Sequence, residues 1–423
     1  MSGYSIKGAR SASGTPLDLH IADGRLVAGP ALGAKIIEAD GLLALPGLVD
    51  MHTHLREPGF EESETVASGT ACAARGGFTA VFAMANTDPV TDSVERAAHI
   101  AELGRAAGNA EVFPIGSITI GLAGDRLSPI AEMAASGVRM FSDDGKCVMN
   151  SALMREALRL SSEANVIIAQ HSQDHVLAGP QAAADERTVA ADLGITGWPW
   201  AAESTIIARD VQLAELTGGR LHACHITTAE SVEVVRWAKA RGVKVTAEAT
   251  PHHLLLDSEL LRGLDTAFKV NPPLRGAEDI EALRSALADG TIDVVGTDHA
   301  PHDPKAKQGD FAHAKPGMLG LEQALASVIE TMINTGRMDW TDLVRVMSVT
   351  PARLTGVPDQ GGMLRIGEVA NLVLVDPTRR AVVDRETSRS ASRNNPYHGL
   401  DLPDPIEMTF YSGHLSYSRR ISA

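Results

Sequence analysis

Short apolar runs alternate with helical stretches along most of the 423-residue chain. Each run has the length of one strand, and the residues between runs show the apolar spacing of amphipathic helices. Units of this kind predict a parallel sheet covered by helices. Eight runs are present: LALPGLVDMH (43–52), FTAVFAMAN (78–86), EVFPIGSIT (111–119), GVRMFS (137–142), NVIIAQH (165–171), RLHACHIT (220–227), KVTAEAT (244–250) and IDVVGTDH (292–299). Eight alternations favour a closed (β/α)8 barrel over an open sheet.

The two ends of the chain have a different pattern from its middle. The middle contains clear helix signals, for example in 151–164 and in 229–242, where a basic turn and a glycine end the helix. The ends contain short β-like runs and turns such as GRLVAG and MTFYSG, which cannot complete a sheet separately. We therefore expect an α/β protein with a barrel over residues 46–355. A small β-sandwich module would be formed jointly by residues 1–45 and 356–423.

Composition narrows the possible partners and the compartment. The chain has 38 basic and 53 acidic residues, a net charge of −15, which argues against nucleic acid or an anionic membrane as a partner. An acidic protein that binds an anion needs a locally positive pocket, which metal ions and arginine can supply. Three scattered cysteines and a polar N-terminus predict a cytoplasmic protein without a disulfide framework.

Polar side chains gather at the ends of the predicted strands, where barrels carry their active sites. They are His52, His54, Asn86, Asp143, Asp144, His171, His225 and Asp298. Residues i and i+2 of a strand point to the same side, so His52 and His54 can face one ion. Neutral imidazoles and carboxylates are ligands of zinc and of several other divalent ions. The sequence therefore predicts a site for one or two metal ions, most simply Zn²⁺, at one rim of the barrel.

Ordered blocks of sequence make the chain similar to the dihydroorotases of the amidohydrolase superfamily, in particular the long-chain bacterial type. The blocks are PGLVDMHTHLREPG (46–59), ETVASGTACAARGGFTAVFAMANTDPVTD (64–92), FSDDG (141–145), HACHITTAES (222–231), AEATPHHLLL (247–256), KVNPPLR (269–275) and GTDHAPH (296–302). The resemblance covers residues 40 to 355 approximately and resumes in 367–376.

The resemblance implies a role for each metal ligand. His52, His54 and Asp298 would hold one metal ion, while His171 and His225 would hold a second. A carboxylate would bridge the two ions.

The sequence offers several candidates for the bridging group. In many relatives it is a carboxylated lysine at the end of strand 4, but Arg139 occupies that place here and cannot serve. The long-chain bacterial enzymes use an aspartate, whose position matches Asp144. Asp143 is the nearer rival and Lys146 a remote alternative.

The implied activity is the reversible cyclisation of N-carbamoyl-L-aspartate to L-dihydroorotate in pyrimidine synthesis. In the hydrolytic direction a metal-activated hydroxide would attack the ring amide, and Asp298 would act as general acid and base. Arg56 lies where a planar guanidinium can bind the substrate carboxylate, and Asn86, Asn271 and His302 would add polar contacts.

Two alternatives and several assembly questions remain open from the sequence. A hydantoinase or allantoinase would keep the metal ligands but would have less use for Arg56. A non-catalytic structural partner of aspartate transcarbamoylase would have lost the ligands, which are all present here. A homodimer is expected, and association with aspartate transcarbamoylase is possible. The polar stretch DPKAKQGDFAHAKPG (303–317) is interpreted as a flap that closes over substrate.

Overall fold

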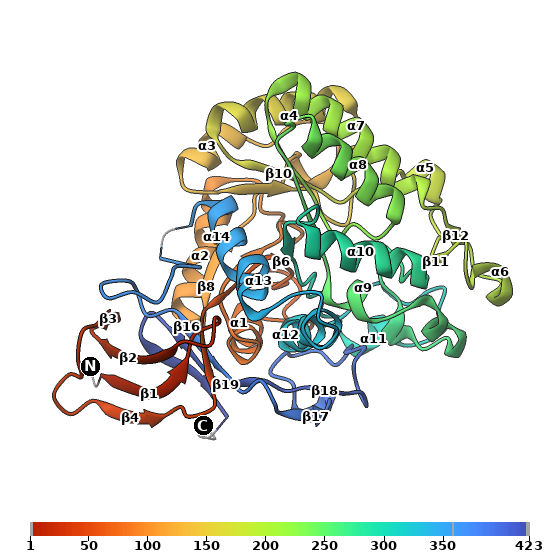
Figure 1. The fold of residues 1–423 in the computed structure, drawn as a ribbon. Coiled ribbons are helices and arrows are strands. Elements are labelled where there is room, and N and C mark those ends of the chain that lie inside the picture. Colours follow the sequence, from red (N-terminus) through yellow and green to blue (C-terminus); the bar gives the residue numbers. More distant parts are fainter. Residues whose placement is uncertain (1–2, 358, 420–423) are drawn as a thin grey trace.

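The computed structural model describes residues 3–357 and 359–419. Eight parallel strands form the centre of the larger unit (Figure 1). They are β6 (Leu48–Thr53), β7 (Phe78–Ala83), β8 (Glu111–Pro114), β9 (Met140–Ser142), β10 (Ile167–Gln170), β13 (Arg220–Ala223), β14 (Val245–Ala249) and β15 (Val294–Val295). Each coincides with one of the eight apolar runs of the sequence, with β6 extending one residue beyond its run to Thr53, so the predicted order of barrel strands is confirmed.

Two parallel bridges close the barrel. Strands β6 to β8 pair in one group, and strands β9, β10, β13, β14 and β15 pair in another. Gly116, just beyond β8, pairs with Phe141 of β9, and Thr53 of β6 pairs with His299, just beyond β15. The first bridge joins the β8 edge of one group to the β9 edge of the other. The second joins the remaining two edges, so the sheet closes on itself. Because all eight strands are parallel, their carboxyl ends lie at the same mouth of the barrel.

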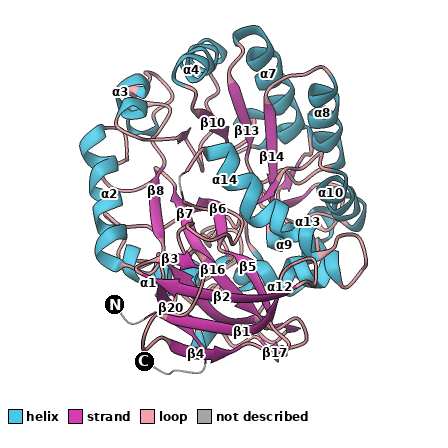
Figure 2. Ribbon diagram, turned by 60° about the vertical axis from the view of Figure 1, so that its left-hand side comes forward, coloured by secondary structure: helices cyan, strands magenta, loops and turns pink. Residues whose placement is uncertain are grey.

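Helices surround the barrel, as the alternating pattern requires (Figures 1 and 2). The main ones are α1 (Val66–Arg75), α2 (Val94–Ala107), α3 (Ile130–Ala135), α4 (Ser151–Ala164), α7 (Ala201–Thr217), α8 (Ala229–Ala240), α10 (Ala277–Asp289), α12 (Ala324–Val328), α13 (Trp340–Val344) and α14 (Thr350–Thr355). Short helices lie in the loops: α5 (His175–Ala178), α6 (Ala190–Leu193), α9 (Pro251–Leu255) and α11 (Pro304–Lys307). The expected helix 151–164 is α4, and the helix expected over 229–242 is α8.

The first apolar run, 43–52, belongs to two sheets rather than to one strand. Its first part is β5 (Leu43–Pro46), which pairs with strands from the chain ends, and its second part is β6 of the barrel. The change of sheet falls at Gly47, where an added Cβ would lie 2.1 Å from Thr79 Oγ1. Only glycine permits this close passage between the sheets, and the alternation of apolar residues in the run gave no sign of it.

Both ends of the chain contribute strands to a single eight-stranded sheet, which lies below the barrel in Figure 2. Its strands are β1 (Tyr4–Arg10), β2 (Pro16–Ala22), β3 (Arg25–Val27), β4 (Lys35–Glu38), β5, β16 (Leu372–Val375), β19 (Ile406–Tyr411) and β20 (His414–Ser418). The antiparallel pairing of β5 with β16 joins the two ends. The α/β fold with a β-rich module from both ends is thus confirmed.

Strand β16 is buried on both faces because it lies between two cores. Leu372 and Leu374 pack in the core of the module, whereas Val373 and Val375 pack in the core of the barrel. Alternate side chains of a strand point to opposite faces, so an unbroken apolar strand serves both cores.

Part of the range 356–423 lies outside this sheet. Strands β17 (Arg380–Val382) and β18 (Asp401–Pro403) pair only with each other among the described strands, and the residues between them run to the barrel mouth. Another short parallel pair, β11 (Ala184–Asp185) with β12 (Gly197–Trp198), lies in the long loop after β10. No described helix has the length and apolar character needed to cross a membrane.

Candidate metal centre and active site

Six side chains from five strand ends meet at the mouth of the barrel. His52 lies in β6 and His54 just after it, and the others follow β9, β10, β13 and β15. They are His52, His54, Asp144, His171, His225 and Asp298, all buried. The structure therefore brings together every residue that the sequence proposed as a metal ligand.

Asp144 lies at the centre of the cluster. Its Oδ1 is 3.4 Å from His52 Nε2, 3.6 Å from His171 Nδ1 and 3.5 Å from His225 Nε2. Its Oδ2 is 3.3 Å from His54 Nε2. All four imidazoles thus face one carboxylate, which is the arrangement that a bridging ligand requires.

Asp298 closes the cluster on the β6 side. Its Oδ1 is 3.1 Å from His54 Nε2 and 3.5 Å from His52 Nε2. Burial alone would raise the pKa of Asp298, but the neighbouring His52 and the hydrogen bond with His54 hold that pKa below its ordinary value. The carboxylate is therefore ionised near neutral pH.

The donor atoms of the cluster fit a divalent cation. Ligand atoms lie within 4.8 Å of one another in the groups His52–Asp144–His225 and His52–His54–Asp298. Within the described residues, His52 Nε2 and Asp144 Oδ1 are buried without a hydrogen-bond partner. Buried polar atoms are normally paired, so unpaired nitrogen and oxygen atoms that face one another fit the ligands of a divalent cation.

The two neighbouring aspartates after β9 have different surroundings. Asp143 Oδ1 accepts hydrogen bonds from the backbone N–H groups of Ile118 (2.8 Å) and Thr119 (2.9 Å). Its carboxylate therefore holds the loop after β8, while Asp144 faces the imidazoles. Arg139 and Lys146 are both exposed, and neither belongs to the cluster.

Glu248 of β14 is part of the site although the sequence reading assigned it no role. Its Oε1 accepts from His52 Nδ1 (2.5 Å) and from the backbone N–H of His225 (3.2 Å), and its Oε2 contacts His222 Nε2 (3.1 Å). With Nδ1 bound in this way, His52 presents Nε2 to the cluster. The sequence feature that could have indicated its role was a glutamate inside the apolar run KVTAEAT.

Three residues of the mouth have a left-handed backbone that is uncommon outside glycine. The φ angles are +28° at His225, +45° at Asp298 and +63° at Arg56. Such conformations persist only where surrounding contacts impose them, and they concentrate at functional sites. In each case the turn carries a side chain that faces the cluster or the cavity beside it.

A cavity of 350 Å³ opens beside the cluster. Its lining includes all four residues that the sequence proposed for substrate binding: Arg56, Asn86, Asn271 and His302. Lys315, Pro316 and Gly317 line it from the predicted flap. The cavity is therefore bounded by the ligand cluster, by a cationic side chain and by the flap.

The side chains proposed to bind substrate are each held by a neighbour. Arg56 Nε donates to Pro301 O (3.0 Å), and Asn86 Oδ1 lies 3.0 Å from His54 Nδ1. His302 Nε2 contacts Pro316 O at 2.8 Å. Burial and then the charge of Arg56 lower the pKa of His302 to about 3, so this ring is neutral at neutral pH.

Gln173 is a second residue that the sequence reading missed. Its Oε1 lies 3.0 Å from His171 Nε2 and accepts from Asn271 Nδ2 at 2.9 Å. It therefore joins a proposed metal ligand to a proposed substrate-binding residue. It lies two positions after His171 in the loop after β10, where no periodic pattern marks it.

The predicted flap is attached to the segment before β15 by two lysines. Lys269 Nζ donates to Phe311 O (2.7 Å) and Ala312 O (2.8 Å). In the opposite direction, Lys307 Nζ donates to Thr266 O (3.0 Å) and Lys269 O (3.1 Å). The flap therefore lies over the cavity in a fixed position; its movement stays a prediction.

Solved structures share this fold along nearly the whole chain. An L-hydantoinase (dihydropyrimidinase) from Arthrobacter aurescens matches with a TM-score of 0.87 at 24% identity, over 99% of this chain and 97% of its own. A dihydropyrimidinase from Brevibacillus agri matches with a TM-score of 0.84 at 22% identity, over 99% and 95%. The chain therefore shares the fold of these two cyclic-amide hydrolases over nearly its whole length.

Sequence relatives narrow this class to one family. A family model described as dihydro-orotase-like matches residues 41–231. Curated dihydroorotases are similar along nearly their full length: 51% identity for Leifsonia xyli (97% of this chain, 95% of the relative), 50% for Streptomyces coelicolor (98% and 98%) and 47% for Mycobacterium tuberculosis (97% and 97%). The chain belongs to the dihydroorotase family.

Proposed function

We propose that this protein is a metal-dependent dihydroorotase, which interconverts N-carbamoyl-L-aspartate and L-dihydroorotate in pyrimidine synthesis. The observation that carries the proposal is the cavity that Arg56 shares with the His and Asp cluster. The substrate has a carboxylate and a cyclic amide, and this cavity offers a guanidinium for the first and metal ligands for the second. The high identity to relatives named dihydroorotase supports the same reading.

The ligand assignment comes from the resemblance to dihydroorotases, and the side chains that it names lie together at the barrel mouth. His52, His54 and Asp298 would hold one ion, His171 and His225 the second, and Asp144 would contact both. Nitrogen and oxygen donors without thiolates suit Zn²⁺ and related divalent ions, one or two per chain. A bound divalent ion would supply an acidified water molecule and would polarise the amide carbonyl.

The protein's own groups would perform the remaining work. Asp298 is ionised and buried beside the ligand imidazoles, so it can take the proton of the attacking water and return it to the departing ring nitrogen. Arg56 would bind the substrate carboxylate, while Asn86, Asn271 and His302 would orient the ring. Burial lowers the pKa of Arg56 to about 10, which leaves the guanidinium charged at neutral pH.

A parallel assay separates this proposal from its alternatives. The purified protein is incubated with dihydroorotate, hydantoin and allantoin, and the metal ions per chain are counted. Hydrolysis of dihydroorotate alone, with metal present, is the expected result. Preferred hydrolysis of hydantoin or allantoin would identify another cyclic-amide hydrolase. Absence of both metal and turnover would favour a structural partner of aspartate transcarbamoylase.

Assembly and location are proposals that rest on the family alone. The protein would work in the cytoplasm as a homodimer, with possible association with aspartate transcarbamoylase. Light scattering after size-exclusion chromatography gives the number of copies, and co-elution with purified aspartate transcarbamoylase tests the association. A monomer that elutes separately would contradict both.

A further inference from the structure

The segment 388–395, which we name the crossover segment, connects β17 to β18 and contacts the barrel mouth. It is far in sequence from every barrel strand, yet several of its polar side chains are buried. Ser390 is 2% exposed, Ser392 0% and Asn394 6%. Buried polar side chains are retained where they make specific hydrogen bonds, so their partners indicate the role of this segment.

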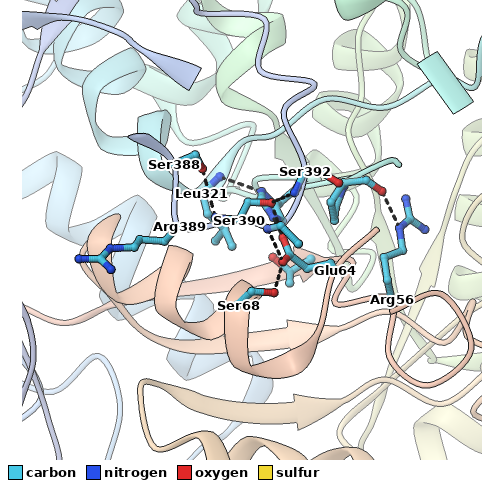
Figure 3. Close-up of polar contacts among 12 residues, drawn as sticks. Arg56, Glu64, Ser68, Leu321, Ser388, Arg389, Ser390 and Ser392 are labelled. Atoms are coloured by element: carbon cyan, nitrogen blue, oxygen red, sulfur yellow. Dashed lines mark hydrogen bonds and ion pairs between the residues drawn. The ribbon is translucent and has the colours of Figure 1, made fainter. Parts of the chain in front are cut away.

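One set of partners belongs to the loop after β6, residues 54–65 (Figure 3). The buried carboxylate of Glu64 accepts from the Ser390 hydroxyl and from the backbone N–H of Ala391 (2.9 Å). Ser392 Oγ donates to Ser63 O at 2.6 Å. The crossover segment therefore holds the end of the loop that carries Arg56.

The second set of partners belongs to the loop after β15, residues 296–320. Asn394 Nδ2 donates to Ala300 O (2.9 Å) and Gly317 O (3.1 Å), and its Oδ1 accepts from the backbone N–H of His302 (3.1 Å). The side-chain amide of Asn394 thus binds three backbone groups of this loop. Those of Ala300 and His302 precede the predicted flap, and that of Gly317 lies at its end.

These contacts surround His302 directly. Gly317 packs against its ring so closely that an added Cβ would lie 2.6 Å from His302 Nε2, and the same nitrogen contacts Pro316 O. Arg56 in turn donates to Pro301 O, the residue before His302. Asn394 therefore fixes the backbone on which both the ring of His302 and the guanidinium of Arg56 rest.

We propose that Asn394 is a positioning residue for substrate binding and that the crossover segment holds together the two loops that line the subsite for the substrate carboxylate. This inference rests on the proposed function. Asn394 touches no substrate atom; it sets the separation between Arg56 and His302. Binding of a carboxylate by two groups depends on that separation, and small displacements of such groups cost large factors in rate or affinity.

The neighbouring Asn395 provides a matched control. It is also buried, at 2% exposed, but its amide binds Gln323 Oε1 (2.9 Å) and the backbone N–H of Tyr397 (2.9 Å), away from the cavity. Asn394→Ala and Asn395→Ala therefore remove the same side chain from adjacent positions. Only the first loses contacts to the loop of His302.

The experiment measures dihydroorotate hydrolysis, metal content and the affinity for orotate, a planar carboxylate that keeps the ring. In Asn394→Ala, KM for dihydroorotate and Kd for orotate should rise about tenfold or more, while kcat changes by less than about threefold and metal content stays at the wild-type level. Asn395→Ala should keep wild-type KM and Kd. Should Asn394→Ala fail to fold, Asn394→Asp is measured. It retains Oδ1 as the acceptor for the His302 N–H, but its second oxygen cannot donate to Ala300 O or Gly317 O, and the same rise is expected.

The outcomes separate this inference from the proposed function. Wild-type KM and Kd in the Asn394 variant, or an equal rise in both variants, would overturn the positioning role. A wild-type protein that neither hydrolyses dihydroorotate nor binds orotate would instead refute the proposed function.

Discussion

Three of the four imidazoles of the cluster present a defined nitrogen to the metal site because the other nitrogen is already bound. His52 Nδ1 contacts Glu248, His54 Nδ1 contacts Asn86, and His171 Nε2 contacts Gln173. Such partners select the tautomer and orient the ring before any ion binds. The sequence predicted the imidazoles from their places at strand ends. It did not predict Glu248, which is distant in sequence from His52, or Gln173, which is close to His171 but lies in a loop without a periodic pattern.

Asp298→Ala tests the proton-transfer role. The variant loses the one carboxylate that faces both His52 and His54 from β15, so kcat should fall by at least about a hundredfold. The far-UV circular dichroism spectrum should not change, because the side chain lies at the mouth rather than in the core. Turnover within about threefold of the wild type would refute the role.

Asp143 and Asp144 form a natural pair for testing the bridging position. Asp144→Ala should lose bound metal, because all four imidazoles face that carboxylate. Asp143→Ala should keep the metal but lower the unfolding free energy by about 1–3 kcal/mol, since the N–H groups of Ile118 and Thr119 lose their acceptor. Metal analysis and urea denaturation of both variants measure this. The reverse pattern, with metal lost from the Asp143 variant, would contradict the assignment.

At the scale of elements, the order and type of the barrel strands could be predicted because each is a separate apolar run. The split of 43–52 between two sheets could not, since both parts are apolar and only the close contact of Gly47 with Thr79 marks the change. The crossover segment was equally hidden. Its serines and asparagines have the composition of a solvated loop, and only the tertiary structure shows that they are buried.

The flap offers a pH-dependent test of its attachment. Burial, and then the charge of Lys269, lowers the pKa of Lys307 to about 7. Between about pH 7 and about pH 10 the unfolded chain binds a proton at Lys307 that the folded protein lacks, so this residue makes stability rise with pH in that window. Lys307→Met should therefore reduce the gain in unfolding free energy between about pH 7 and about pH 9. Urea denaturation at both values measures it.

Lys305 supplies the control for that measurement. It lies in the same short helix, α11, but is exposed. Lys305→Met should therefore keep the wild-type dependence on pH. Equal dependence on pH in wild type and Lys307→Met would show that Lys307 is not buried in the folded protein.

At the scale of the whole molecule, the four imidazoles and two carboxylates of the cluster place polar atoms at the barrel mouth that the rest of the protein does not fully pair. The chain carries a net charge of −15, and Asp144 and Asp298 add two buried carboxylates at the barrel mouth. The β-rich module packs against the core of the barrel. The crossover segment holds the loops of the mouth. Stability of the mouth itself should therefore depend on a bound cation that binds only the folded chain.

Removal of metal should consequently destabilise the protein. A ligand present at a thousandfold above its Kd adds about 4 kcal/mol to the unfolding free energy, so dialysis against a chelator should lower Tm and added Zn²⁺ should restore it. Calorimetric scans before and after dialysis, with metal analysis of each sample, measure the effect. Asp144→Ala, which lacks the central ligand, should show no change of Tm with chelator or with Zn²⁺. If the wild-type protein loses its metal and keeps its Tm, the four imidazoles and two carboxylates are satisfied without an ion, and the stabilising role of the metal is refuted.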